Sequence, residues 1–305
     1  MTLPNFILLG AAKSGTSSVW NYLKQHPQVF MSNPKEPNFF VFEGMKLPPF
    51  IGPEPPEILC KRLYQNTITD WQSYQQLFDR VSGESAIGEA SVRYLYFPQA
   101  PEKIKNYLPD IKMIVMLRNP VDRLYSHYVM NIRHLLEPLS LEDALDQEQE
   151  RINNRWGWDW HYTQVGMYSE QIKRYLDYFP PEQLKIIVYD DFRQDPLGTM
   201  KEVYQYLGVD DTFVPNVEGR KNQGYWPKNK LVHQFLYTSN PLKSFLEKWL
   251  PRSLYQKLIK NLKQWNSAPI PPLSMELRQS LNEVFRSDII NLKEILHREI
   301  AWLDS

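Results

Sequence analysis

The segment Gly10–Ser18 has the residue types that bind a phosphate. It follows a continuous apolar run, Asn5–Gly10, and it leads into residues with helical spacing. Small residues at such a junction let backbone N–H groups approach an anion closely, and the start of the following helix favours negative charge. Thr16 and Ser17 add hydroxyl donors, and Lys13 adds a mobile positive charge. The segment therefore predicts a phosphate cradle, although a plain Gly/Ser connection would have a similar composition.

The order of residues in this loop argues against ordinary ATP hydrolysis. In a P-loop that binds ATP, a lysine follows the second glycine directly, and Ser or Thr then holds magnesium. Here Thr16 follows Gly15, and Lys13 precedes that glycine. The lysine contact to the outer phosphates would be misplaced. A P-loop nucleotide kinase or ATPase, which would share the strand-loop-helix pattern, is kept as the alternative prediction. Magnesium-dependent ATP binding would favour it.

A second potential anion site follows another apolar run. Arg118 comes directly after Ile111–Leu117, and Ser126 lies on the helical pattern that begins near Pro120. Both side chains can reach an anion at the carboxyl end of the strand. The alternative is a structural salt bridge for Arg118 and solvent exposure for Ser126. Two anion sites after two strands suit one ligand that carries two separate phosphates.

A glutamate and a late basic loop could complete such a site. Glu36 lies in Asn33–Phe40, where a polar stretch precedes two aromatic residues, and this places it at the lip of a cleft. A lone glutamate is more often an exposed surface charge. Arg220 and Lys221 lie in the glycine-flanked segment Glu218–Gly224, which a surface turn explains equally well.

Apolar runs and helical patterns alternate along the chain. Strands are expected over Asn5–Gly10, Ile111–Leu117 and Leu184–Tyr189, and helices over Tyr168–Phe179 and Leu197–Leu207. Such alternation predicts an α/β fold of the P-loop type, with three layers and a central parallel sheet flanked by helices.

The length of the chain favours a single domain over residues 1–305. We expect a core over about 4–224 and a helical C-terminal region over about 225–305, which could pack on the sheet or form an appendage. The prolines of Leu47–Pro56 predict an irregular surface loop. The four rings in Trp156–Tyr162 could stack on a sugar, but packing in the core is the stronger expectation.

Composition argues against several classes of partner. Lys and Arg number 35, as do Asp and Glu, so no net charge attracts nucleic acid or an anionic membrane. Cys60 is the only cysteine, which favours a reducing, cytoplasmic compartment. No apolar run is long enough for a membrane span, and His127 and His161 lack the spacing of metal ligands. A lumenal domain separated from its anchor would have the same composition.

Several of these segments resemble the sulfotransferase family. Ala12–Ser18 is similar to the loop that binds the 5'-phosphosulfate of 3'-phosphoadenosine 5'-phosphosulfate (PAPS), the donor in that family. Arg118 and Ser126 are similar to the pair that binds the donor's 3'-phosphate. The resemblance implies that Lys13 stabilises charge on the bridging oxygen as sulfur departs. The residues that it implies for the 5'-phosphate are Ser14, Gly15, Thr16, Ser17 and Ser18.

The resemblance extends to the acceptor side. Lys35–Phe40 is similar to the segment that carries the glutamate base in heparan-sulfate-type enzymes, which implies that Glu36 removes a proton from the acceptor. Gly88–Tyr94 is similar to a segment of the same enzymes, which implies acceptor contacts for Glu89 and Arg93. Glu89 could also orient neighbouring basic residues or form a structural ion pair. Those enzymes often carry a lysine where this sequence has Ala90. Either Arg93 substitutes for it or the acceptor lacks acidic groups.

The resemblance covers about Pro4 to Gly224, including Gly166–Phe192, which is similar to bacterial members. Arg220 and Lys221 are similar to a late basic loop that also reaches the 3'-phosphate. The implied reaction is metal-free, in-line transfer of a sulfuryl group from PAPS to a hydroxyl or amine, with a carbohydrate as the expected acceptor. The alternatives are the kinase or ATPase described above and a non-catalytic nucleotide-binding protein of the same fold.

Overall fold

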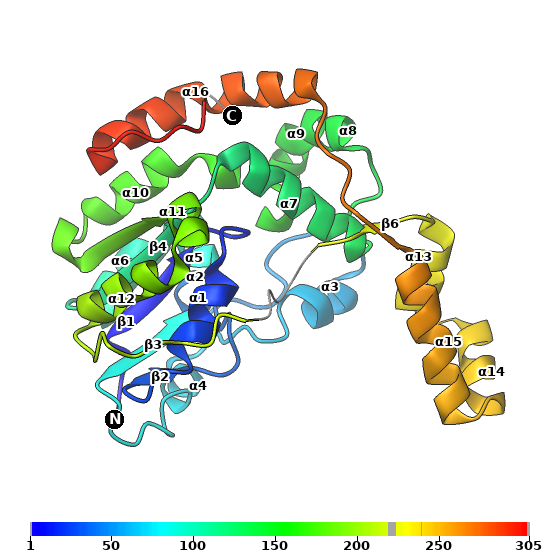
Figure 1. Ribbon diagram of the computed structural model, residues 1–305, viewed down its shortest axis with the longest axis horizontal. Coiled ribbons are helices and arrows are strands. Elements are labelled where there is room, and N and C mark those ends of the chain that lie inside the picture. Colours follow the sequence, from blue (N-terminus) through cyan, green and yellow to red (C-terminus); the bar gives the residue numbers. More distant parts are fainter. Residues whose placement is uncertain (1, 219–223, 239, 304–305) are drawn as a thin grey trace.

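Five parallel strands form a central sheet in the computed structural model, which describes residues 2–218, 224–238 and 240–303 (Figure 1). Their order across the sheet is β2-β3-β1-β4-β5. The strands are β1 (Phe6–Gly10), β2 (Val29–Met31), β3 (Ala86–Ala90), β4 (Lys112–Leu117) and β5 (Leu184–Val188). The sheet and its flanking helices confirm the predicted α/β fold.

The central strand β1 is apolar throughout because both faces of the sheet are covered. In β1, the side chains of Phe6 and Leu8 pack on one face, and those of Ile7 and Leu9 pack on the other. All four side chains are fully buried. This is why continuous apolar runs predict β1, β4 and β5.

The apolar runs do not predict β2 and β3. Gly88 and Glu89 interrupt β3, and both are explained by packing. A Cβ atom on Gly88 would lie 2.2 Å from the ring of Phe6, so glycine makes room for that ring. The buried Glu89 carboxylate accepts hydrogen bonds from the Tyr74 hydroxyl at 3.3 Å and the Ser91 hydroxyl at 2.8 Å.

Helices cover both faces of the sheet (Figure 1). One layer consists of α1 (Thr16–Leu23), α11 (Tyr189–Gln194) and α12 (Pro196–Leu207). The other contains α2 (Phe39–Phe42), α5 (Arg93–Tyr96), α6 (Ala100–Tyr107), α7 (Pro120–Arg133) and α10 (Tyr168–Leu176). The remaining helices before residue 200 are α3 (Pro56–Leu63), α4 (Trp71–Gln76), α8 (Leu141–Asp146), α9 (Glu148–Asn153) and the 3-10 turns Trp158–Trp160, Gln164–Gly166 and Pro181–Gln183.

The C-terminal region divides into an appendage and a helix that packs on the core (Figure 1). The appendage comprises α13 (Lys230–Tyr237), α14 (Pro241–Trp249) and α15 (Arg252–Trp265), between the paired short strands β6 (Trp226–Pro227) and β7 (Ser267–Ala268). The last helix, α16 (Met275–Leu296), lies on α7 and α10. The segment from α13 to α15 thus forms an appendage, whereas α16 packs on helices rather than on the sheet itself.

Phe285 and Asp288 make two of the contacts that attach α16 to the core. Phe285 is fully buried and lies close against Gly166. The Asp288 carboxylate accepts hydrogen bonds from the backbone N–H groups of Tyr168 at 2.8 Å and Ser169 at 2.9 Å, at the start of α10. Across the described residues, every helix is too short or too polar to cross a lipid bilayer.

Candidate active site

The carboxyl ends of the five strands meet at one edge of the sheet, where an open cleft of about 1230 Å³ lies. Each strand is followed by a residue that lines this cleft. Those residues are Lys13 after β1, Glu36 after β2, Arg93 after β3, Arg118 after β4 and Tyr189 after β5. The parallel topology therefore brings together segments that are far apart in the sequence.

The cleft contains most of the residues singled out from the sequence. It is lined by Lys13, Gly15, Thr16, Ser17, Ser18, Glu36, Arg93, Arg118 and Ser126. Ser14 and Glu89 are buried behind it rather than lining it. Arg220 and Lys221 lie outside the described residues, although the preceding segment Asn216–Glu218 lines the cleft.

The loop between β1 and α1 has the shape of an anion cradle. Gly15 has φ 93°, a left-handed conformation that favours glycine, and a Cβ atom there would lie 3.0 Å from the ring of Tyr189. Its carbonyl accepts the N–H groups of Ser18 at 2.9 Å and Val19 at 3.3 Å, which begins α1. The N–H groups of Thr16 and Ser17, the first two residues of α1, have no partner within the helix. They are therefore available to an anion in the cleft.

Lys13 lies among other positive charges. Its Nζ atom is 3.6 Å from the Met130 sulfur, its nearest hydrogen-bonding atom among the described contacts. Burial, followed by the positive charges of Arg133 and Arg118, lowers the pKa of Lys13 to about 8. An anion beside Lys13 would offset this repulsion, so the cleft favours a negatively charged ligand.

Arg118 joins the two predicted anion sites. Its guanidinium donates to the carbonyl of Lys13 at 3.2 Å and lies 5.1 Å from the ring centroid of Tyr189. None of the ion pairs among the described residues includes Arg118, so the alternative of a structural salt bridge is not found. Ser126 lines the same cleft from α7. The positive charge of Arg118 is therefore available to a ligand.

Glu36 is held at the lip of the cleft and is half-buried. One carboxylate oxygen accepts the backbone N–H of Val92 at 2.9 Å, and the other accepts Lys35 Nζ at 3.0 Å. Lys35 Nζ also lies 3.4 Å from the Ser17 hydroxyl. The backbone N–H of Glu36 donates to the Ala90 carbonyl at 2.9 Å, which ties this segment to β3. These contacts fix the carboxylate, and Lys35 links it to the cradle.

Arg93 lines the cleft but is already paired. Its guanidinium lies 3.3 Å from the Asp159 carboxylate, and both side chains are buried. It also stacks over the rings of Tyr64 and Trp158, at 5.4 and 5.0 Å from their centroids. Glu89 is fully buried, and burial raises the pKa of its carboxyl to about 7. Of the two acceptor contacts implied by resemblance, the structure therefore brings only Arg93 to the cleft.

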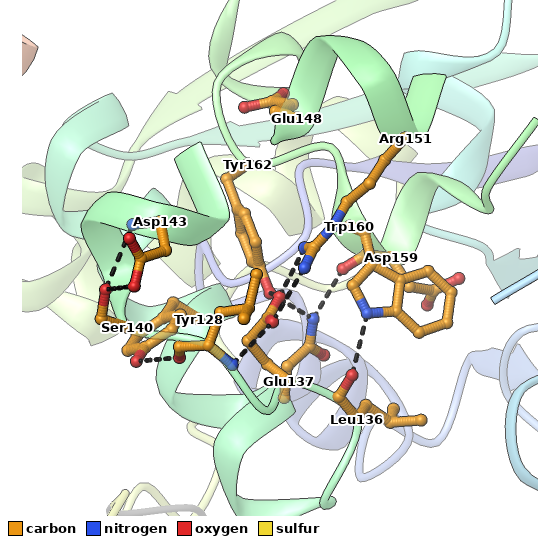
Figure 2. Close-up of polar contacts among 12 residues, drawn as sticks. Tyr128, Leu136, Glu137, Ser140, Asp143, Glu148, Arg151, Asp159, Trp160 and Tyr162 are labelled. Carbon is orange, nitrogen blue, oxygen red and sulfur yellow. Dashed lines mark hydrogen bonds and ion pairs between the residues drawn. The ribbon is translucent and has the colours of Figure 1, made fainter. Parts of the chain in front are cut away.

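A buried ion pair supports the wall of the cleft after α7 (Figure 2). Arg151 donates to both carboxylate oxygens of Glu137, at 2.6 and 3.0 Å, and the Tyr162 hydroxyl donates to Glu137 at 2.8 Å. The Trp160 indole N–H donates to the carbonyl of Leu136 at 3.0 Å. Leu136 lines the cleft. Breaking such a pair would leave an uncompensated buried charge, so these contacts hold the wall in place.

The aromatic segment and the histidines serve mainly as packing. Trp160 and Tyr162 are buried in the core, as expected, and only Trp158 of the three also lines the cleft. Burial lowers the pKa of His161 to about 4. Across the described residues no three His, Cys, Asp or Glu side chains gather as a metal site. That the reaction needs no metal stays a prediction.

Sequence reasoning missed Lys35 and the aromatic wall of the cleft. Tyr22, Tyr189 and Phe192 line the side near α1, with ring centroids 6.1 Å apart for Tyr22 and Phe192. Tyr189 could have been found, because it directly follows β5 at the edge where the other site residues lie. Lys35 could also have been found, because a positive charge directly before Glu36 indicates a possible partner for its carboxylate.

Comparison with known proteins supports one family. Residues 4–213 match the model described as "Sulfotransferase family". A crystal structure titled sulfotransferase from Alicyclobacillus acidocaldarius is 32% identical, with a TM-score of 0.77, and the match covers 100% of both chains.

Curated relatives have longer chains. The human bifunctional heparan sulfate N-deacetylase/N-sulfotransferase 3 is 25% identical over 97% of this chain, which spans 30% of that protein. The mouse heparan sulfate glucosamine 3-O-sulfotransferase 3B1 is 26% identical over 68% of this chain and 46% of its own length. The family match, covering more than half of the chain, and the full-length structural similarity show that this protein is an enzyme of the sulfotransferase family.

Proposed function

We propose that the cleft transfers a sulfuryl group from PAPS to a hydroxyl or amine of a carbohydrate acceptor. The observation that carries the proposal is the contact between Arg118 and the Lys13 carbonyl. It joins the two predicted anion sites, and both sites line the same cleft. One bisphosphorylated nucleotide can then reach both. The aromatic wall of Tyr22, Tyr189 and Phe192 suits its adenosine.

The residues present fit the charges of this donor. In the proposal, the N–H groups of Thr16 and Ser17 and the hydroxyls of Thr16, Ser17 and Ser18 hold the 5'-phosphate. Arg118 and Ser126 hold the 3'-phosphate. Ser14 supports the loop from behind. By sequence resemblance, Arg220 and Lys221 reach the 3'-phosphate as well. When bound, the donor supplies the sulfuryl group and a phosphate leaving group.

Two side chains carry the chemical step in this proposal. Glu36 accepts the proton of the acceptor hydroxyl or amine while the oxygen or nitrogen of the acceptor bonds to sulfur. The bond between sulfur and the bridging oxygen breaks, and that oxygen stays on the nucleotide with its negative charge. Lys13 neutralises this charge, so the protein itself provides the electrostatic stabilisation.

The acceptor side of the cleft favours an acceptor without acidic groups. Its cations are already neutralised, since Lys35 pairs with Glu36, Arg62 with Glu54 and Arg93 with Asp159. Leu63, Leu136 and Trp158 add apolar surface beside them. A neutral sugar, which has hydroxyls and apolar ring faces, matches this wall better than a polyanionic one does.

A transfer assay with labelled PAPS tests the proposal directly. We expect transfer to neutral oligosaccharides and amino sugars, with weaker transfer to highly sulfated or carboxylated ones. Calorimetry should show binding of the product nucleotide without magnesium, and no tighter binding of ATP with magnesium. Absence of both nucleotide binding and transfer would overturn the proposal, and binding without transfer would favour a non-catalytic nucleotide-binding protein.

The 3'-phosphate assignment gives a separate prediction. Replacing Ser126 with Ala or Arg118 with Met should weaken binding of 3',5'-bisphosphorylated adenosine by about 10- to 100-fold, because each removes a hydrogen bond to a charged group. Binding of adenosine 5'-phosphate, which lacks the 3'-phosphate, serves as the control. It should be unchanged in Ser126→Ala and less affected than binding of the bisphosphate in Arg118→Met, which also removes the contact with the Lys13 carbonyl. Equal weakening for both nucleotides would contradict the assignment.

The protonation of Lys13 should limit activity at high pH. Because the pKa of Lys13 is about 8, its positive charge is present below that pH and is lost above it. The value of kcat/KM should therefore fall as pH rises through about 8, since kcat/KM reports the free enzyme. Lys13→Arg should move this fall to higher pH because arginine stays protonated. A fall at the same pH in that variant would assign it to another group.

A further inference from the structure

The helical appendage concentrates positive charge that the neutral whole chain conceals. Between residues 230 and 265 the sequence has seven Lys or Arg and one acidic residue, Glu247, so this segment carries a net charge of +6. The rest of the chain is correspondingly negative. A large local excess of one charge marks a surface that binds the opposite charge.

The same segment exposes large apolar side chains. Sixteen large apolar side chains are exposed in the described part of the chain, and seven of them lie between residues 230 and 265. They are Leu231, Tyr237, Phe245, Trp249, Leu254, Leu258 and Trp265. Trp249 is 69% exposed and Trp265 is 56% exposed. Such a concentration of exposed apolar surface marks an interaction site.

These side chains are ordered into stripes. Phe245 and Trp249 lie one turn apart on α14, with ring centroids 5.9 Å apart. On α15, the spacing of Leu254, Leu258 and Trp265 by four and then seven residues places them on one side of the helix. Lys248, Lys257 and Lys260 are exposed on the same two helices. The appendage is therefore amphipathic on its outer surface, with cations beside the apolar stripes.

We propose that the appendage formed by α13, α14 and α15 binds the surface of an anionic lipid bilayer. Lysines on an amphipathic helix are attracted to acidic headgroups, while Trp, Phe and Leu enter the boundary between headgroups and acyl chains. A soluble polyanion would engage the lysines but leave the apolar stripes uncovered. A second copy of the chain would bring negative charge. Its other exposed apolar side chains are scattered, however, with Val214 in the segment after α12 and Met275 at the start of α16.

The position of the appendage links binding to the cleft. The His233 ring nitrogen Nε2 lies 2.9 Å from the Arg133 carbonyl, at the end of α7, and the Arg133 guanidinium lies 4.4 Å from the ring centroid of Tyr225. His134 and Leu136, which follow α7 directly, line the cleft. The appendage projects away from the sheet beyond this point (Figure 1). A bilayer bound by the appendage would therefore lie on the side of the molecule where α7 ends.

Vesicle flotation of the full chain tests this inference. We expect binding to vesicles of equimolar phosphatidylcholine and phosphatidylglycerol, decreasing with salt, and little binding to phosphatidylcholine alone. The variant Lys248→Gln/Lys257→Gln/Lys260→Gln should bind about 100-fold more weakly, from about 1 kcal/mol for each lysine. The variant Trp249→Ser/Trp265→Ser should lose binding to a similar extent.

Matched controls alter similar residues elsewhere on the surface. Lys46→Gln/Lys173→Gln/Lys201→Gln removes three exposed lysines, and Val214→Ser/Met275→Ser removes exposed apolar side chains, so both should bind vesicles like the unmodified chain. Absence of flotation with anionic vesicles would overturn the inference. Binding to a heparin fragment that depends on the lysines but not on the tryptophans would assign the surface to a soluble polyanion instead. Concentration-dependent dimerisation abolished by the same variants, without flotation, would assign it to a second copy.

Discussion

Replacement of Lys13 with Met should lower kcat for sulfuryl transfer by about 10²- to 10³-fold. Removing one preorganised group that stabilises developing charge in a buried site typically has an effect of this size. The ammonium group would act mainly when the bond between sulfur and the bridging oxygen breaks, so the affinity for the product nucleotide should change much less. Single-turnover rates with saturating donor, together with calorimetry, separate these two quantities.

Two controls make the Lys13 result specific. Methionine keeps the apolar stem that packs near Met130, and it carries a Cβ like lysine, so the backbone at φ 66° experiences the same strain. Lys46→Met changes an exposed lysine away from the cleft and should leave kcat unchanged. If Lys13→Met weakened nucleotide binding as strongly as it slowed transfer, the lysine would serve binding rather than the chemical step.

Replacement of Glu36 with Gln should lower kcat by about 10²- to 10⁴-fold, the usual contribution of a general base. Glutamine has nearly the same shape, and its carbonyl oxygen can still accept the Val92 N–H that holds Glu36. It cannot take a proton from the acceptor. Transfer rates measured at saturating donor, with thermal unfolding to confirm the fold, give this comparison.

The acceptor itself supplies the sharpest test of Glu36. A phenol that ionises easily needs little help from a base, so the loss caused by Glu36→Gln should shrink with such an acceptor. Glu57→Gln changes an exposed glutamate on α3 and is the matched control. A loss of equal size with every acceptor would instead indicate that Glu36 only positions Lys35 and Val92.

The sequence predicts the strands that contain apolar runs. It misses β3, which is equally buried but contains Gly88 and Glu89, whose packing partners lie elsewhere in the sequence. β1, β4 and β5 are apolar runs because helices cover both faces of the sheet. In β3, Gly88 depends on the ring of Phe6, and Glu89 depends on Tyr74 and Ser91. β2 has only three residues, too few for a pattern to emerge.

The candidate site shows the same division. Lys13 and Arg118 could be placed because each follows a recognisable strand, and the rule for parallel sheets then sets them at one edge. The pairing of Arg93 with Asp159 joins residues 66 positions apart, and neither sequence segment indicates it. The location of α16 could not be predicted either, because its contact with the start of α10 depends on the side chain of Asp288.

The assembly of one cleft from all five strand ends ties ligand affinity to the integrity of the whole sheet. Its lining runs from Ala12 to Glu218, so the pocket exists only after each crossover connection has been completed. A nucleotide that binds there selects the folded chain over partly folded ones and stabilises it by mass action. The thermal stability of this enzyme should therefore rise with the fraction of clefts that hold a nucleotide.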